Sequence, residues 1–436
     1  MKTGRIPEIT RCRLCTVITL FAVTLSATPL FAAQPCVSDG RQLEWEETWE
    51  LLLEESPSIG ALKEAVRASR AGLKSAAVAS KVTTAVTGTG VKEEADRASS
   101  AVRFTVSYST SLFGRETAQV KSAALLHEES LLSLDKGYLD LYNHAATAYW
   151  GAAAARVAVR AAEEELSKRR AFLDDAQLRY EQGLVPELDV LRAKSSLAEA
   201  QYLLSTKESQ MVNMEAMLKG LAGWKNISPA EGVLEAEPPM HETPPDYGKV
   251  CKEHPTICKA ELEVERQKAL LRLAKKTSAP TLSLSASNSL ALDGSYAATY
   301  TQDDWYGSAT ITIPVTDGGA AHWAAEKARA GVASAERALA SARAGVMRDL
   351  FTAWQDYQSS LTGLASARER FGLLAREREI VLLRYREGLA SQIEVLDVQT
   401  RYTEANADFI DSKKAVFVAC AALAAARAEL PVEVDQ

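Results

Sequence analysis

Cys251, His254 and Cys258 are the residues of this chain whose types and spacing could do chemistry. They form a Cys-x2-His-x3-Cys pattern, which could either hold a metal ion or contain a disulfide. A metal site would need a fourth ligand, and the sequence offers no evident one. In an oxidising compartment the two cysteines are close enough in sequence to pair across a short loop. We therefore favour a Cys251–Cys258 disulfide over a metal site.

Glu394 and Asp397 are a second pair of interest, and they lie three positions apart on one face of an expected helix. The structural interpretation is favourable charge near a helix N-terminus, worth about 0.3–1 kcal/mol. Elsewhere the five histidines are scattered, and the sequence has no Gly-x-Ser-x-Gly motif or phosphate-binding loop. We predict that the protein is not an enzyme.

The first 33 residues are arranged like a secretory signal peptide, with basic side chains, an apolar stretch over 17–25 and then small residues. Cys36 would suit a lipoprotein, but the three residues before it are a poor lipidation signal. Without the four basic groups and one acidic group of that segment, the chain keeps 46 of 50 basic and 56 of 57 acidic groups, a net charge of −10. This charge argues against nucleic-acid binding. The rest of the sequence contains no stretch of about 18 apolar residues, so we predict no transmembrane helix.

The sequence contains an internal duplication. Residues 178–184, Leu-Arg-Tyr-Glu-Gln-Gly-Leu, return 205 positions later at 383–389 as Leu-Arg-Tyr-Arg-Glu-Gly-Leu. At the same offset, the Leu-Asp-Val-Leu of 188–191 corresponds to the Ile-Glu-Val-Leu of 393–396. A repeat over this distance gives both halves the same elements in the same order.

Each half is expected to contain a very long helix followed by a return helix. Proline costs about 3 kcal/mol inside a helix, and none occurs in residues 58–185 or 315–430. Apolar and alanine residues over 332–364 recur in steps of three and four, close to coiled-coil spacing. We predict helices over about 116–182 and about 320–387, each roughly 100 Å long. Such helices must stand in a bundle or tube.

At the other end of each half the sequence predicts strands. Apolar residues alternate with polar ones, mostly Ser or Thr, in four segments: 82–91, 102–109, 281–286 and 308–313. This pattern is typical of membrane β-barrels, and Trp305 and Tyr306 would suit an aromatic girdle. A small soluble β-domain is the alternative. Four strands cannot close a barrel in lipid, where every strand edge must be paired, so several chains would have to contribute.

The predicted fold class is mainly α with a membrane β-barrel portion. Residues 226–250, part of the stretch that holds most of the prolines, form an irregular connector between the repeats. We expect a signal peptide at 1–33 and a tail at 431–436. The first repeat would cover 34–225, with a strand hairpin at about 80–113 and a helical hairpin at 115–222. The second repeat would cover 251–430, with a strand hairpin at about 280–315 and a helical hairpin at 319–430.

Over nearly all of its length after the signal peptide, the chain resembles the TolC-like outer-membrane efflux protein family. The features that carry the resemblance are the duplication, the Leu-Arg-Tyr-x-x-Gly-Leu turn in both halves, and the Ile-Pro-Val-Thr-Asp-Gly-Gly of 313–319 before the second long helix. The first half has a shorter Leu-Phe-Gly-Arg at 112–115. The resemblance implies a homotrimer with a twelve-stranded barrel and a helical tunnel, and it implies no catalytic centre and no cofactor.

The resemblance also assigns roles to particular residues. Glu394 and Asp397 would form acidic rings at the periplasmic entrance, and Tyr385 and Asp189 would tether neighbouring helix pairs in the closed state. Ala390 stands where family members have an arginine, so one tether is missing. The hairpin tips would contact a periplasmic adaptor, although glycine caps alone explain the glycines. These tip residues are Gly183, Leu184, Gly388 and Leu389.

We therefore predict an outer-membrane channel subunit of a tripartite efflux or type I secretion system. Its partners would be a periplasmic adaptor, an inner-membrane pump of the RND, ABC or MFS type, and outer-membrane lipid. The alternative is a secreted periplasmic coiled-coil structural or adaptor protein. An adaptor would pair its helical hairpin with a lipoyl-like domain, which the sequence does not show.

Overall fold

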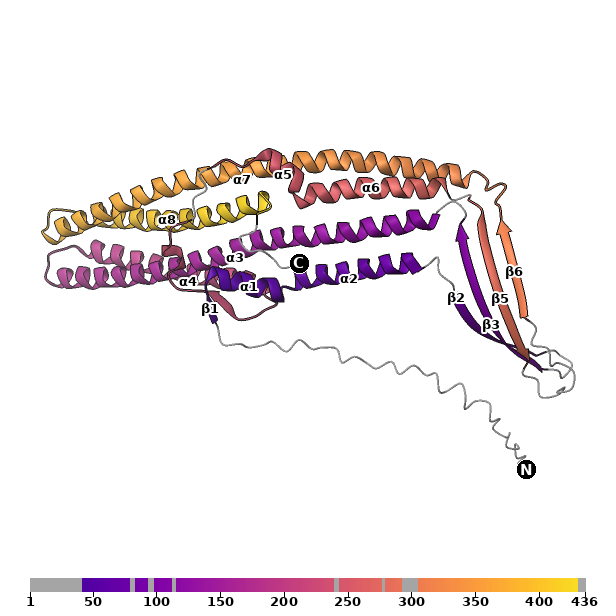
Figure 1. Cartoon of the computed structure of the whole chain (residues 1–436). Coiled ribbons are helices and arrows are strands. Elements are labelled where there is room, and N and C mark those ends of the chain that lie inside the picture. The colour runs from indigo at the N-terminus through magenta and orange to yellow at the C-terminus, as the bar shows by residue number, and fades with distance from the viewer. Residues whose placement is uncertain are drawn as a thin grey trace, which may run out of the picture.

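The computed structural model describes residues 41–78, 83–92, 98–111, 115–238, 243–276, 279–291 and 305–429. These residues form an elongated bundle of helices with a curved sheet at one end (Figure 1). The predicted signal peptide, Cys36 and the tail at 431–436 lie outside the described residues. None of the described helices is long and apolar enough to cross a bilayer.

Two helices of equal length determine the length of the molecule. α3 (Arg115–Glu181) and α7 (Ala320–Arg386) each contain 67 residues, which corresponds to about 100 Å. The return helices α4 (Glu187–Leu221) and α8 (Gln392–Ala426) each contain 35 residues and lie antiparallel to them. The long helices begin and end within one or two residues of the bounds expected from proline placement and apolar spacing. Both hairpin tips lie at the end opposite the sheet (Figure 1).

Shorter helices complete the bundle beyond the ends of α4 and α8. α1 (Trp45–Glu55) and α2 (Pro57–Val78) belong to the first repeat, and α5 (Tyr247–Glu253) and α6 (Pro255–Lys275) belong to the second. α2 packs on α3, and α6 packs on both α3 and α7. α3 therefore contacts helices of both repeats along most of its length.

The sheet at the end of the bundle also joins the two repeats. Its antiparallel order is β2-β3-β5-β6, with bounds Thr83–Lys92, Ala98–Ser111, Thr281–Ala291 and Trp305–Thr312. β2 and β6 are its two edges. A separate pair of parallel strands, β1 (Arg41–Leu43) and β4 (Ile227–Pro229), lies midway along the bundle, near the 3-10 turn η2 (Val233–Glu235).

Strand register separates the sheet into an apolar face and a polar face. Val86 pairs with Phe104, and Trp305 occupies the same row through Asn288. The apolar side chains of this row are exposed, with 64% of Val86, 51% of Phe104 and 73% of Trp305 accessible. Tyr306 pairs with Ser287 on the opposite, polar face. Trp305 and Tyr306 therefore do not share a face, and only Trp305 suits a girdle beside lipid.

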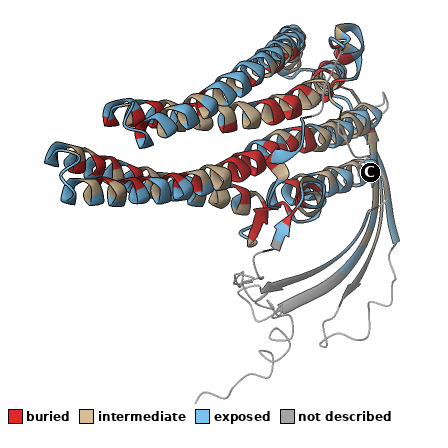
Figure 2. Cartoon of the chain, turned by 90° about the vertical axis from the view of Figure 1, so that its left-hand side faces the viewer, coloured by how far each residue is buried: buried red, intermediate tan, exposed pale blue. Residues whose placement is uncertain are grey.

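The largest core lies in the middle of the bundle and is aromatic. Trp150 of α3 stacks on Phe417 of α8 with ring centroids 3.9 Å apart. Tyr149 is fully buried and donates a 3.0 Å hydrogen bond from Oη to the carbonyl oxygen of Leu43. Viewed from the hairpin tips, Figure 2 shows many buried residues in the middle part of the helices. This core fixes the two repeats to each other.

The predicted Cys251–Cys258 disulfide is wrong for this structure, in which both cysteines are free. Sγ of Cys251 lies 3.3 Å from Sδ of Met347, and Sγ of Cys258 lies 3.4 Å from the carbonyl oxygen of Lys252. The chain bends between α5 and α6 at His254, and each thiol contacts a different neighbour. No cluster of three or more His, Cys, Asp or Glu within the described ranges could hold a metal ion.

His254 caps α6 instead of binding a metal. Its Nδ1 accepts a 3.2 Å hydrogen bond from the backbone N–H of Thr256, which requires this nitrogen to be unprotonated. Burial lowers the pKa of His254, and nearby Lys136 lowers it further, while Asp140 and Asp349 oppose the shift. Protonation is therefore more favourable in the unfolded chain than in the folded one.

We expect His254→Asn to flatten the acid side of the stability profile. The ordinary histidine pKa is about 6.5, and the folded value is lower, so the wild type loses stability as pH falls below about 6.5. Asparagine is a good N-cap that does not titrate. Thermal unfolding of the detergent-purified protein at about pH 7 and about pH 5 measures the difference. Equal losses in the two proteins would contradict this assignment.

Candidate functional site at the hairpin tips

Both long helices end in the same glycine motif. The N–H of Gly183 donates to the carbonyl of Tyr180, and the N–H of Leu184 donates to Arg179, each at 2.9 Å. The second repeat reproduces this at Gly388 and Leu389, with distances of 3.0 and 2.7 Å. These are the paired bonds of a Schellman motif, which requires positive φ at the glycine. The observed φ values are 72° for Gly183 and 74° for Gly388.

The glycine motif leaves an apolar side chain exposed at each tip. Leu184 and Leu389 are both 68% accessible to solvent. The first residues of the return helices add to this surface, since Leu188 is 52% exposed and Ile393 is 56% exposed. Helix capping needs the glycine but does not need an exposed leucine, so these side chains are available for contact with another protein.

The Glu394 carboxylate caps the N-terminus of α8, as its position near the start of this helix suggests. Ser391 and Glu394 form a capping box, in which Oε1 of Glu394 accepts from the backbone N–H and the hydroxyl of Ser391 at 3.3 and 3.0 Å. Asp397 is bound differently, through a 3.0 Å contact with Nε of Arg401. Both acidic residues remain exposed. The sequence therefore identified a surface acidic pair correctly, and one member also caps α8.

The first repeat carries a different charge pattern at the equivalent positions. The 205-residue offset places Asp189 opposite Glu394 and Arg192 opposite Asp397. Asp189 and Arg192 form an ion pair at 3.5 Å. At these two equivalent positions only the second repeat has two carboxylates, whereas the first turn of α4 carries Glu187 and Asp189.

Tyr385 is buried where the two hairpins meet. Its ring packs 5.7 Å from Phe172, and the Arg179 guanidinium lies 5.0 Å from its centre. Burial raises the pKa of Tyr385, so the hydroxyl is neutral and able to donate. No described residue bonds this buried Oη, and no hydrogen bond joins it to Asp189. The two residues predicted as a tether lie near each other but are not bonded within one chain.

A hydrogen bond from a side chain to the backbone links the two tips instead. Nε2 of Gln392, at the start of α8, donates a 2.8 Å hydrogen bond to the carbonyl oxygen of Asp189, at the start of α4. Gln392 is 4% exposed. This bond holds the starts of the two return helices side by side.

A buried charged cluster farther up the hairpins was not predicted. Nε of Arg169 lies 2.7 Å from Oε1 of Glu165, and both residues belong to α3. Nη2 of Arg378 of α7 lies 3.7 Å from the other oxygen of Glu165. The hydroxyl of Ser196 in α4 accepts a hydrogen bond from Arg169, and the guanidinium of Arg378 lies 4.5 Å from the ring centre of Tyr402 in α8.

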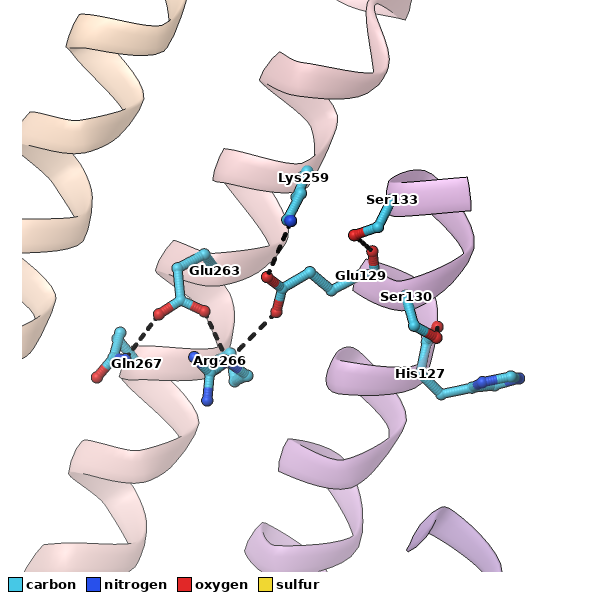
Figure 3. A network of polar contacts seen from close by, with 8 residues as sticks. All are labelled: His127, Glu129, Ser130, Ser133, Lys259, Glu263, Arg266 and Gln267. Carbon is cyan, nitrogen blue, oxygen red and sulfur yellow. Dashed lines mark hydrogen bonds and ion pairs between the residues drawn. The ribbon is translucent and has the colours of Figure 1, made fainter. Parts of the chain in front are cut away.

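A second polar network, nearer the sheet, joins α3 to α6. Figure 3 shows Glu129 of α3 facing Lys259 and Arg266 of α6, with ion-pair distances of 3.9 and 3.6 Å. Arg266 also contacts Glu263 at 2.6 Å. His127 points away from this network, and its Nδ1 lies 3.0 Å from the hydroxyl of Ser69 in α2. These side chains connect helices and do not form a metal or catalytic site.

Comparison with known proteins gives a family and a fold. The model of a family described as outer membrane efflux protein matches residues 49–224 and 247–429. No curated protein sequence gives a significant match. The match covers both repeats, which favours a channel over the alternative of a secreted coiled-coil or adaptor protein.

Solved structures share the fold at low identity. A Pseudomonas aeruginosa membrane protein is 19% identical, with a TM-score of 0.75 over 88% of this chain and 89% of that chain. The Campylobacter jejuni CmeC outer membrane channel is 15% identical, with a TM-score of 0.77 over 88% and 85%. The open state of the Neisseria gonorrhoeae MtrE outer membrane channel is 18% identical, with a TM-score of 0.77 over 90% and 93%.

The capping box predicts different effects for two changes at Glu394. Glu394→Ala removes the carboxylate that accepts a hydrogen bond from the backbone N–H of Ser391. The change should destabilise the first turn of α8 by about 1 kcal/mol, so amide exchange there should become about fivefold faster. Glu394→Gln keeps an acceptor in the same place and should leave exchange unchanged. Hydrogen exchange followed by mass spectrometry measures both. Equal rates in the alanine variant and the wild type would show that the box does not stabilise this turn.

Proposed function

Because the chain belongs to the outer membrane efflux protein family, we propose that its two hairpin tips form the periplasmic entrance of the channel. The protein is an outer-membrane channel subunit of a tripartite efflux system, with a large periplasmic part. Proteins of this family are homotrimers that work with adaptor proteins and inner-membrane pumps.

The observation that supports the proposal best is the contrast between the two ends of the molecule. At one end a sheet exposes an apolar face that includes Phe104 and Trp305, which suits contact with lipid. From there, helices of about 100 Å lead to tips with exposed leucines and carboxylates. The edges β2 and β6 are unpaired within the described chain, and pairing them between three copies would remove every free edge.

We place the acidic pair at the mouth of the duct. Three chains meeting at their tips would bring three copies of Glu394 and of Asp397 together as two stacked rings. Rings of acidic side chains favour cations and repel anions. The exposed Leu184 and Leu389 would contact the periplasmic adaptor, and an inner-membrane pump of the RND, ABC or MFS type would supply the substrate.

We assign the closed state in part to Tyr385 and Asp189. The Tyr385 hydroxyl is buried, neutral and without an acceptor among the described residues. An unpaired buried donor costs about 1–3 kcal/mol, so a carboxylate oxygen of Asp189, reached by a small shift or across a subunit boundary, is a suitable partner. Ala390 cannot supply the additional arginine tether, so the contact between Tyr385 and Asp189 has a larger share in holding the channel closed.

Neutralising the acidic rings should reduce cation preference. The double variant Glu394→Gln with Asp397→Asn removes the ring charge, keeps the capping box and leaves Arg401 paired with Glu377 at 2.8 Å. Purified trimers in planar bilayers should conduct ions, and the variant should show weaker cation selectivity and weaker block by multivalent cations. Wild-type selectivity in an intact variant trimer would move the entrance elsewhere. A wild-type trimer that conducts no ions would contradict the proposed function itself.

Replacing Tyr385 with Phe should raise the conductance of the resting channel. The change removes only the hydroxyl and keeps the ring packed on Phe172 and Arg179, so helix packing should be preserved. Losing one buried hydrogen bond of about 1 kcal/mol would shift the closed–open equilibrium about fivefold. Single-channel recording measures this, and Tyr180→Phe is the matched control because Tyr180 is 45% exposed at the equivalent position. Equal conductance in wild type and Tyr385→Phe would exclude the tether.

A further inference from the structure

The charged cluster around Glu165 is unusual because it places more positive than negative charge inside the helical hairpins. One carboxylate, Glu165, faces two guanidinium groups, Arg169 and Arg378. The side chains are 7%, 8% and 12% exposed in that order. A buried charge is tolerated only when it is paired and hydrogen-bonded, so both arginines depend on the same carboxylate.

The cluster also connects all four helices of the two hairpins. Glu165 and Arg169 come from α3, the hydroxyl partner Ser196 from α4, Arg378 from α7 and the ring under Arg378, Tyr402, from α8. It borders a groove of about 410 Å³ lined by residues of α3, α4 and α8. Apart from this cluster, the Gln392–Asp189 bond and the contacts of Tyr385 are the main polar links between the hairpins near the tips.

We propose that Glu165 is a positioning residue for the entrance, which holds the α7/α8 hairpin against the α3/α4 hairpin in the closed channel. The proposal rests on the entrance function assigned above. Arg378 is seven residues, or about two helical turns, before Tyr385 on α7, so fixing Arg378 also fixes the tip that carries Tyr385 and Glu394.

The geometry indicates that this lock is breakable. Nε of Arg378 is buried without a partner in the described structure, and the 3.7 Å between Nη2 of Arg378 and Glu165 is longer than a close ion pair. The bond within α3, between Arg169 and Glu165, is shorter and moves with one helix. Separation of the hairpins would therefore break the contact of Arg378 with Glu165 and leave both the α3 pair and the stacking of Arg378 on Tyr402 intact.

Glu165→Gln tests the proposal in planar bilayers. The change removes the carboxylate charge with little change in volume and leaves both arginines uncompensated, so resting conductance should rise about tenfold or more. Glu164→Gln is the matched control, because Glu164 is the adjacent α3 residue, is 64% exposed and pairs with Lys168 at 3.7 Å. The control should conduct like the wild type.

Adding Arg378→Met to Glu165→Gln should leave resting conductance near the Glu165→Gln value, because both changes break the same contact between the hairpins. A purely structural role would instead make the double variant leakier than either single variant. If Glu165→Gln fails to form trimers, Arg378→Met alone decides. It removes the α7 side of the contact and leaves Glu165 paired with Arg169, and it should leak. Conducting trimers with wild-type resting conductance in Glu165→Gln, or in Arg378→Met, would overturn the lock without affecting the channel function.

Discussion

The structure depends on close packing around one helix, α3, which contacts α2, α4, α6 and α8. Such contact on several sides is possible because the middle of α3 is built from small residues. Ala145, Ala146 and Ala152 are fully buried, and a side chain at Gly151 would come within 3.3 Å of Sδ of Met214 in α4. Alanine also has the highest helix propensity. The same residues therefore favour a long helix and let four others approach it.

Because of this packing, the molecule has two arms that are joined at its centre, one toward the sheet and one toward the hairpin tips. The Trp150–Phe417 stack and the surrounding aromatic core lie midway. Toward the sheet, contacts between α3 and α6 include ion pairs of Glu129 with Lys259 and Arg266, whose side chains are exposed or half-buried. Toward the tips, the contacts are fewer and include buried charge. Polar contacts lose their strength when their partners separate. An arm that is held by a few such contacts is therefore suited to a change between two states.

Sequence patterns predicted the elements well because long helices and alternating strands are governed by local rules. Proline absence, glycine caps and period-two segments predicted the two helical hairpins, both turns and all four strands of the sheet, but not the bounds of α1, α2, α5 and α6 or the β1–β4 pair. The errors concern side-chain direction. Cys251 and Cys258 are close in sequence, but the α5–α6 bend directs them to Met347 and to the Lys252 carbonyl. The Glu165 cluster joins residues over 200 positions apart, and no local spacing indicates such contacts.

A useful signal was nevertheless present in the differences between the repeats. At the 205-residue offset, Glu165 corresponds to Arg370 and Arg378 to Leu173, so the cluster has no duplicate. The repeated tyrosines also diverge, because Tyr180 is 45% exposed and Tyr385 only 8%. The two similar motifs thus lie in different environments, because Tyr385 packs against Phe172 and Arg179 of α3. Duplication supplies the shared hairpin, and differences between the repeats place the buried charge of Glu165 and Arg378 and the exposed acidic pair of Glu394 and Asp397.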